Sequence, residues 1–451
     1  MQRTLYWVNK DLRINDNLAL NLASQSEQLM CVAVIDPKWF IANQQQALPL
    51  GKLRLGFLLQ GLQSLNENLQ KLGQKLHIVN GDVVNSLNAI CNQYGITDLV
   101  TTKRPGSYER DINKQIKQRQ PSLNLHQVEQ FTLFTEQTLP FELADLPASY
   151  SKFRKVVTHL TPATPQTAVY NLPAQFKQSL AEVHHCWDDV FVEQLISENM
   201  TKEDNETGYQ FIGGEAAGLQ QLQDYFSSSA PERYKEVRNK LSGWDNSSKL
   251  SAWLNYGFIS VRQVFSCIDK FEQLHGKNPS TESLYHEILW REYFQWLHYK
   301  IPDKLYHFKG LANTSPLTSF YPERFKKWCT GNTPYPLVNA CMNELFKTGY
   351  LSNRGRQIVA SCLVNELSID WRYGAAWFEQ HLIDYDAAIN WGNWQYIAGV
   401  GVDPRGGRHF NLKKQTQMHD PDGEYQAVWA GEVNRQITSP LDSVSADDWP
   451  V

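Results

Sequence analysis

Short apolar runs alternate with helical patterns over the first 130 residues, and this alternation restricts the possible fold more than any other feature. Runs of this length, with a helical pattern between successive runs, are typical of buried parallel strands. The apolar runs are 5–8, 30–35, 76–79, 99–101 and 123–127. The helical patterns are 18–24, 53–72, 83–94 and 108–119. The sequence therefore predicts an α/β N-terminal domain, a doubly wound parallel sheet with helices on both faces.

The rest of the chain has a different pattern. Helical periodicity dominates from residue 211 to residue 299 and again from residue 336, so we expect a second, larger all-α domain. A chain of 451 residues exceeds the size that one hydrophobic core supports. We expect domains at 1–130 and 206–430, an interdomain connector rich in Pro, Thr and Gln at 131–205, and a short tail at 431–451.

Composition excludes several classes of protein. The seven cysteines form no CxxC pair and no Cys/His cluster with zinc or iron–sulfur spacing, so we expect no metal. The charged Lys10, Asp11 and Arg13 stand where a signal peptide would need its apolar stretch, and no apolar run reaches membrane-spanning length. No GxGxxG or Walker loop is present. We expect a cytoplasmic protein, monomeric and not bound to membranes.

The stretch 353–410 concentrates polar and aromatic side chains. A helix with an apolar face of mixed i+4 and i+5 steps follows Arg354 and Arg356. Cations at a helix start are unfavourable unless an anion or a carboxylate lies beside them. In one interpretation, Arg356 and Asp384 form a structural ion pair, and the tryptophans at helical spacing belong to the hydrophobic core, as they usually do. A bound polyanionic cofactor is the alternative.

A second candidate anion site lies upstream. Asn246-Ser-Ser-Lys-Leu-Ser-Ala252 opens a helix, and Tyr234 precedes it. Hydroxyls and backbone N–H groups at a helix start, with a lysine nearby, suit a pyrophosphate. A serine that only caps the helix is the simpler interpretation.

The C-terminal half contains a series of ordered motifs. They are Ser352-Asn-Arg-Gly-Arg-Gln357, Asp370-Trp-Arg372, Trp377-Phe-Glu379, Asp384-Tyr-Asp386, Gly392-Asn-Trp-Gln-Tyr396 and Asp403-Pro-Arg405. These motifs resemble those of the cryptochrome/photolyase family, and Gln357 and Tyr396 point to its DASH-type cryptochrome branch. The similarity spans nearly the whole chain and is densest between residues 241 and 429.

The resemblance implies that the helical domain binds FAD. Asn390 then faces the flavin N5 atom, and Trp394 and Trp371 are the first two members of a tryptophan chain that reduces the flavin in light. The third member is missing, because Thr318 stands at its place. We therefore expect either that Tyr321 or another surface aromatic replaces it, or that photoreduction is inefficient. The implied FAD contacts are Tyr234, Ser247, Ser248, Lys249, Leu250, Ser251, Asn353, Arg356, Asp384, Asp386 and Asn390.

The same resemblance implies a blue-light photolyase. Reduced FAD would donate an electron to a cyclobutane pyrimidine dimer and recover it after the ring splits. Glu287 would hydrogen-bond the flipped-out base and Trp290 would stack on it, with Gln357 and Tyr396 as further walls of the pocket. Tyr396 stands where photolyases active on duplex DNA usually have Trp. Single-stranded DNA is therefore the expected partner, with RNA and duplex DNA as weaker candidates.

Two further groups and two alternative functions remain. Arg405, Lys413 and Lys414 could contact DNA phosphates or form a solvated basic loop. Relatives often carry methenyltetrahydrofolate as an antenna; Glu109 matches one acidic contact, but Arg104 stands where relatives usually have another carboxylate.

Two other functions are alternatives to the photolyase. One is a blue-light photoreceptor that signals through the FAD redox state without repair, and the other is a light-independent Trp-rich nucleic-acid binder.

Overall fold

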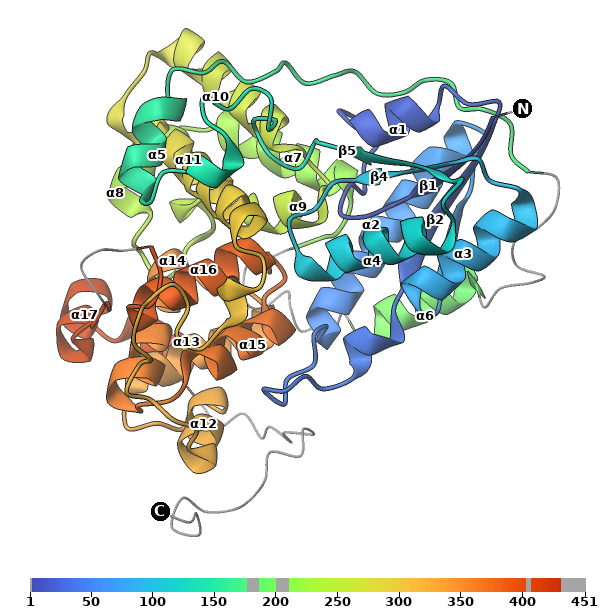
Figure 1. The fold of residues 1–451 in the computed structure, drawn as a ribbon. Helices are drawn as coiled ribbons and strands as arrows, with labels where there is room; N and C mark the ends of the chain where they lie inside the picture. Colours follow the sequence, from blue (N-terminus) through green and yellow to red (C-terminus); the bar gives the residue numbers. More distant parts are fainter. Residues whose placement is uncertain (1, 177–185, 200–210, 403–406, 431–451) are drawn as a thin grey trace.

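The computed structural model describes residues 2–176, 186–199, 211–402 and 407–430. One part is built on a sheet and the other is helical, and the two lie side by side (Figure 1). None of the helices in these ranges is long and apolar enough to span a bilayer.

Six strands form one sheet in the order β5-β4-β1-β2-β3-β6. The first five pair in parallel, and β6 adds to the edge at β3 in the antiparallel direction. The strands are β1 (Arg3–Trp7), β2 (Gln28–Ile35), β3 (Leu76–Asn80), β4 (Asp98–Thr102), β5 (Asn124–Val128) and β6 (Cys186–Trp187). All five predicted parallel strands are thus present.

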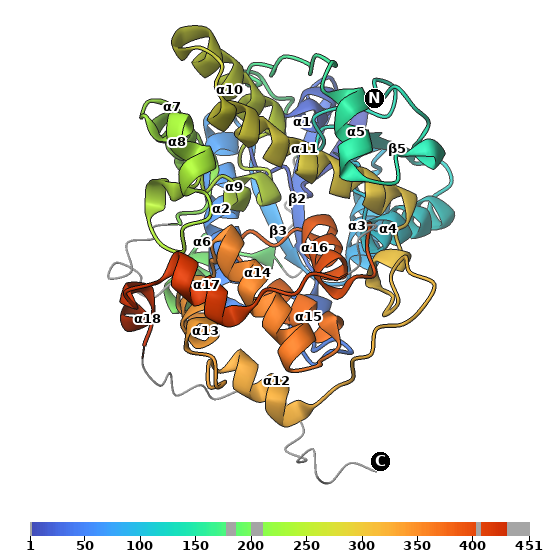
Figure 2. The same cartoon turned by 90° about the vertical axis from the view of Figure 1, so that its left-hand side faces the viewer.

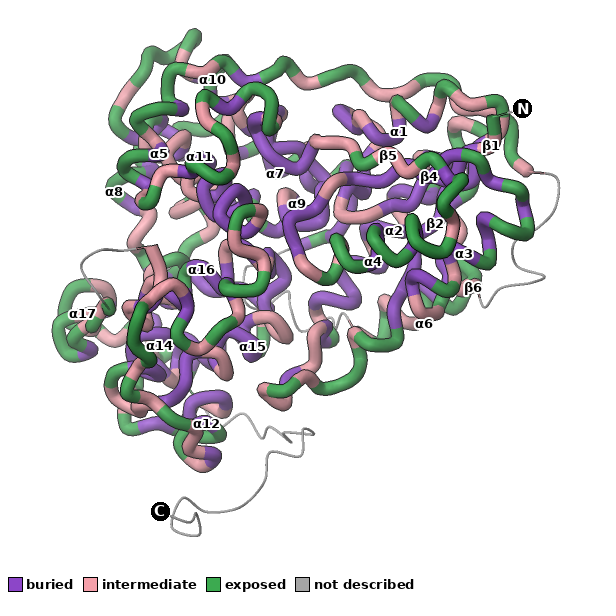
Figure 3. The backbone as a smooth tube through the Cα atoms, in the orientation of Figure 1, coloured by how far each residue is buried: buried purple, intermediate pink, exposed green. Residues whose placement is uncertain are grey.

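Alternate residues of the strands belong to two cores. Leu5 and Trp7 of β1 pack with one buried cluster, whereas Tyr6 packs with the other. The first cluster includes residues of α3 and α4, and the second includes residues of α1 and α2, so both faces are covered. The helices are α1 (Leu18–Ala23), α2 (Lys52–Lys71), α3 (Val83–Tyr94) and α4 (Ser107–Arg119). The doubly wound prediction is confirmed, and Figure 3 shows that the strands are largely buried.

The second part is helical, as predicted, and Figure 2 looks onto it with the sheet behind. Its first helices are α7 (Glu215–Phe226), α8 (Ala230–Val237), α9 (Ser251–Tyr256), α10 (Val261–His275) and α11 (Pro279–Lys300). After the short turn η6 (Lys304–Tyr306) follow α12 (Pro322–Cys329), α13 (Pro336–Thr348), α14 (Asn353–Ser361), α15 (Trp371–His381), α16 (Ala387–Ala398), α17 (Leu412–His419) and α18 (Glu424–Val428). The core of this part is continuous with one face of the sheet.

The mixed apolar spacing after residue 353 has a structural cause. Helix α14 continues directly into a π-helical turn, η7 (Cys362–Glu366), in which the Leu367 N–H donates to the carbonyl oxygen of Cys362. A hydrogen bond that spans five residues widens the helix, so the apolar face shifts from an i+4 to an i+5 step. Such π-turns occur often at functional sites.

The loop after β1 joins the two parts. Asp16 forms a buried ion pair with Arg262 of α10, and their side chains are 0% and 5% exposed. The side chain of Asn17 accepts from Leu20 N and caps α1. Buried charges of this kind are stable only when paired, so this loop holds the helical part in a defined position on the sheet.

The connector contains structure that the sequence did not predict. It includes α5 (Tyr150–Val157), strand β6 and α6 (Asp189–Asn199). Helix α5 packs on α11, and α6 packs on α2. After α5, residues 158–176 cross along the upper side of the molecule in Figure 1. Near the end of this segment, Ala174 O accepts from Leu29 N of β2. The connector therefore contacts both parts of the molecule.

Candidate functional site

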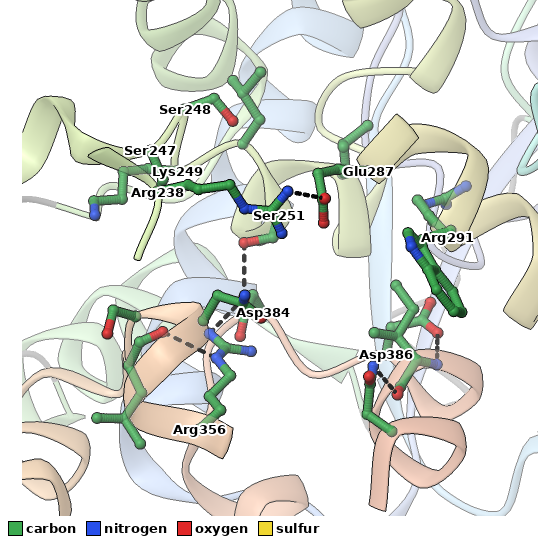
Figure 4. A pocket seen from close by; sticks show the side chains of 18 of the residues that line it. Arg238, Ser247, Ser248, Lys249, Ser251, Glu287, Arg291, Arg356, Asp384 and Asp386 are labelled. Carbon is green, nitrogen blue, oxygen red and sulfur yellow. Dashed lines mark hydrogen bonds and ion pairs between the residues drawn. The ribbon is translucent and has the colours of Figure 1, made fainter. Parts of the chain in front are cut away.

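The helical part encloses a cavity of about 440 Å³. Residues from α8 to α11 line one side, and residues from α14 to α16 line the other; Figure 4 shows their polar side chains facing one another. Most of the predicted site residues line it. They are Tyr234, Ser247, Ser248, Lys249, Leu250, Ser251, Glu287, Trp290, Asn353, Arg356, Gln357, Asp384, Asp386, Asn390, Trp394 and Tyr396.

The serine-rich loop before α9 has an unusual backbone. Lys249 adopts a left-handed conformation, with φ of +57°, and is only 4% exposed. Its Nζ lies 3.3 Å from the hydroxyl of Tyr350 and 4.7 Å from the centre of that ring. A non-glycine residue with positive φ is uncommon and costs backbone strain. The loop therefore holds Ser247 to Ser251 along the cavity in a conformation that a simple helix cap does not require.

Asp384 connects that loop to α14. One of its oxygens, Oδ2, accepts from Ser251 Oγ at 2.7 Å and from Arg356 Nη2 at 2.8 Å. Arg356 also donates through Nε to Leu351 O. The other oxygen of Asp384, Oδ1, is buried without a hydrogen-bond partner among the described residues. Since buried polar atoms are nearly always paired, this orphaned oxygen indicates a missing donor in the cavity.

Asp386 and Asn390 are fixed by the start of α16. Asp386 Oδ1 accepts from Ile389 N and from Gln295 Nε2, and Asp386 caps the helix. Although burial alone would raise the pKa of Asp386, the nearby guanidinium groups lower it, so the carboxylate stays ionised. Asn390 donates through Nδ2 to Ala375 O at 2.9 Å. This hydrogen bond fixes the orientation of the Asn390 side-chain amide and leaves its Oδ1 atom able to accept a hydrogen bond.

Glu287 pairs with a residue that the sequence did not single out. Its Oε1 lies 2.5 Å from Nη1 of Arg238, at the end of α8. Desolvation raises the pKa of Glu287, and Arg238 partly offsets this shift. No local pattern indicated Arg238, because its partner lies 49 residues away.

The aromatic residues that line the cavity also contact residues that the sequence did not single out. Trp290 stacks on Tyr150 of α5, and the Tyr396 hydroxyl accepts from Arg408 Nη2 at 2.6 Å. Gln357 Oε1 is buried and has no partner among the described residues. An unpaired acceptor in the lining of the cavity suits a ligand with N–H groups at its edge.

Trp394 lines the cavity, whereas Trp371 lies behind it and is fully buried. A Cβ atom added at Gly374 of α15 would fall 2.2 Å from the Trp394 ring, so only glycine allows this contact. Thr318 is near Phe320, which stacks on Tyr373 with centroids 3.9 Å apart.

Besides Trp371, the predicted residues Lys413, Lys414 and Glu109 do not line the cavity. Arg405 is outside the described residues. Lys413 and Lys414 are exposed on α17. Glu109 is in the first turn of α4, and the neighbouring Arg104 is buried with its guanidinium carbon 3.4 Å from the centre of the Phe131 ring. A guanidinium cannot replace the missing carboxylate contact, so this place does not match the acidic pair expected for a methenyltetrahydrofolate antenna.

The cavity itself fits FAD. Its volume is within the range of small-molecule sites. It combines a lysine–serine loop suited to phosphates with the unpaired oxygens of Asp384 and Gln357. Two clusters that the sequence placed more than a hundred residues apart therefore face a single space.

Comparisons with known proteins agree with this assignment. Residues 283–445 match the family model for the FAD binding domain of DNA photolyase, and residues 4–170 match that for DNA photolyase. The chain is 45% identical to Cryptochrome DASH of Idiomarina loihiensis, over 99% of this chain and 96% of that protein. It is 42% identical to Cryptochrome DASH of Vibrio parahaemolyticus, over 99% of this chain and 97% of that one. A crystal structure of a Synechocystis cryptochrome superposes with a TM-score of 0.89 at 36% identity, over 95% of this chain and 88% of that chain.

Proposed function

The chain belongs to the cryptochrome/photolyase family, in its DASH cryptochrome branch, and we propose that it uses blue light to repair cyclobutane pyrimidine dimers in single-stranded DNA. As a member of this family it is a photolyase-type flavoenzyme that binds FAD and acts on DNA. The observation that carries the proposal is one cavity lined both by the flavin-contacting candidates Asn390 and Trp394 and by the base-contacting candidates Glu287 and Trp290.

The polar residues of the cavity are suited to hold the cofactor. The loop of Ser247 to Ser251 offers hydroxyls and backbone N–H groups to the pyrophosphate. Arg356 and Asp384 brace that loop from the facing wall through Ser251. Asn390 is anchored by Ala375 O and would offer its amide to the ring system of the cofactor. Reduced FAD, when bound, supplies the electron that splits the dimer in light and recovers it afterwards.

The remaining lining residues suit an extrahelical dimer. Trp290 and Tyr396 offer flat aromatic surfaces, and base–aromatic stacking stabilises by roughly 1–3 kcal/mol per base. Glu287 and Gln357 can exchange hydrogen bonds with the edge of a pyrimidine. The cavity therefore offers stacking and edge recognition together, which a flipped-out base requires.

The preference for a single strand rests on Tyr396. A phenol ring provides less stacking surface than an indole, so less free energy is available to pull a dimer from a duplex. In a single strand the dimer is already unpaired, and this cost is absent. Arg408, which donates to the Tyr396 hydroxyl, limits how far the ring can move toward a base.

The test is the loss of cyclobutane pyrimidine dimers from oligonucleotides under blue light. FAD-loaded, chemically reduced protein is given the same dimer in a single strand and in a duplex, with a dark sample as control. We expect rapid repair of the single strand and slow repair of the duplex. Equal repair of both would refute the strand preference. No repair of either would refute the enzyme and favour a photoreceptor.

A further inference from the structure

A row of aromatic rings leads from the interior of the helical part toward its surface. The rings of Trp371 and Trp391 have centroids 5.7 Å apart, and those of Trp391 and Tyr306 have centroids 5.0 Å apart. Trp371 and Trp391 are buried, whereas Tyr306, in η6, is half-buried. Helix α16 packs against both α15 and η6, which brings the three rings together.

The inner end of this row lies close to the cavity. Trp394 lines the cavity and is on α16, as is Trp391. The far edge of the Trp394 ring presses on the backbone of α15 at Gly374, and Trp371 begins the same helix one turn earlier. Trp394 thus bridges the flavin cavity and the helix that carries Trp371.

The outer end of the row has a proton acceptor. The Tyr306 hydroxyl lies 3.2 Å from Nε2 of His298 on α11. His298 is 1% exposed, and burial lowers its pKa to about 4, so its imidazole is neutral near pH 7. A neutral imidazole that carries its proton on Nδ1 can accept the tyrosine proton at Nε2. This distance is within the range for direct proton transfer.

We propose that Tyr306 is the terminal electron donor when light reduces the oxidised flavin of this protein, and that His298 accepts the phenolic proton of Tyr306. One electron passes from Tyr306 by way of Trp391, Trp371 and Trp394 to the light-excited flavin. The O–H bond of Tyr306 breaks, and an N–H bond forms at Nε2 of His298. The protein then holds a neutral tyrosyl radical beside an imidazolium, while the flavin carries the extra electron.

Two other tyrosines, Tyr321 and Tyr373, are less suitable as the terminal donor. Tyr321 makes no aromatic ring contact among the described residues; its ring packs under the guanidinium of Arg324. Among the described residues, the aromatic rings in contact with Tyr373 are Phe320 and Phe325, and Phe325 in turn contacts Trp328. Phenylalanine rings are hard to oxidise. Neither hydroxyl has a hydrogen-bonded base in the part of the chain that the structure describes. This inference rests on the flavin site of the proposed function, but not on dimer repair.

The test is electron paramagnetic resonance of FAD-loaded, fully oxidised protein frozen during blue illumination without added reductant. We expect a tyrosyl radical in wild type, its loss in Tyr306→Phe, and its retention in Tyr321→Phe and Tyr373→Phe. Trp391→Phe, which interrupts the row but keeps Tyr306 itself, should also lose the signal. A tyrosyl signal that survives Tyr306→Phe, or a wild type with tryptophanyl radicals alone, would overturn the proposal.

A second variant isolates the role of His298. In His298→Gln the amide oxygen can still accept a hydrogen bond from Tyr306, but it is too weak a base to take the proton. We expect the tyrosyl signal to disappear although FAD content is unchanged; an undiminished signal would exclude His298 as the acceptor. Chemically reduced protein repairs without prior photoreduction. A negative repair assay would therefore contradict the proposed function and leave the role of Tyr306 untouched, whereas a missing tyrosyl radical would contradict only the role of Tyr306.

Discussion

Tyr150 and Trp290 stack face to face, with ring centroids 3.7 Å apart and planes 12° apart, although one comes from the connector and the other from the helical part. The Tyr150 hydroxyl donates to the carbonyl oxygen of His286 and fixes the pair. Because Tyr150 covers one face of the indole, only the remaining surface of Trp290 is available to a base. The connector therefore helps to shape the candidate dimer site.

The first prediction concerns this stack. Tyr150→Ala removes an aromatic pair worth about 0.5–1.5 kcal/mol and allows Trp290 to reorient. We expect affinity for a dimer-containing single strand to fall by roughly twofold to tenfold, as measured by fluorescence anisotropy. Tyr150→Phe keeps the ring and should bind as wild type does. If the alanine and phenylalanine variants bind alike, the stack does not position Trp290.

The second prediction concerns Asp384. Asp384→Asn leaves the Arg356 guanidinium without its carboxylate and should destabilise the protein by roughly 3 kcal/mol, the low end for a buried pair because Arg356 is partly exposed. FAD retained through purification should also fall sharply. Thermal melting and the ratio of flavin to protein absorbance measure the two effects. Ser251→Ala, which removes a single hydrogen bond to the same carboxylate, should cost only about 1 kcal/mol.

The third prediction concerns strand preference. Tyr396→Trp combined with Gln357→Met should increase repair of a dimer in duplex DNA relative to the single strand, by up to about tenfold if the indole adds about 1.4 kcal/mol of stacking. Tyr396→Phe also loses the hydrogen bond from Arg408 and serves as the matched control. The ratio of initial repair rates on the two substrates is the measurement. An unchanged ratio in the double variant would show that Tyr396 and Gln357 do not set the preference.

The fourth prediction concerns α17. Lys413→Glu with Lys414→Glu should weaken binding of single-stranded DNA and lower the slope of log affinity against log salt by about 1.4, if each lysine contacts one phosphate. Lys71→Glu with Lys114→Glu makes the same charge change at exposed positions of α2 and α4. That control should keep the wild-type slope. Equal slopes in both double variants would assign Lys413 and Lys414 to a solvated surface.

The fifth prediction concerns Glu292 of α11, which is 0% exposed and accepts from Leu133 N and Trp296 Nε1. Burial raises its pKa to about 7, although Arg291 and these donors oppose the shift. The native state therefore keeps a proton that the unfolded state loses above about pH 4.5. This contribution to stability is complete below that pH and is lost as pH rises through about 7.

As the pH rises from about 4.5 to about 7, the titration of Glu292 alone should therefore lower the free energy of unfolding by about 3 kcal/mol. Urea unfolding of wild type and Glu292→Gln at several pH values measures it, because the variant cannot titrate there. The difference between the two proteins should change steadily with pH. A constant difference would mean that Glu292 is already ionised at low pH.

Local pattern alone determined much of this protein. The spacing of apolar residues predicted every parallel strand and the helices between them, because buried strands and amphipathic helices impose short periods on the chain. The lysine–serine loop was also recognisable, since it is a contiguous cluster of polar side chains, whereas the roles of Arg356, Asp384 and Asp386 were inferred from the resemblance to a known family. Even the i+5 step at Leu363, which marks the π-turn, was visible as an irregular spacing.

Tertiary structure alone decided which distant groups meet. The two-residue strand β6 is too short to produce a pattern, and it forms because the edge of β3 is available for pairing. Arg238 meets Glu287, and Tyr150 meets Trp290, only after α8 and α5 have packed against α11. Contacts of this kind depend on the three-dimensional path of the chain, and neither propensity nor periodicity encodes them locally.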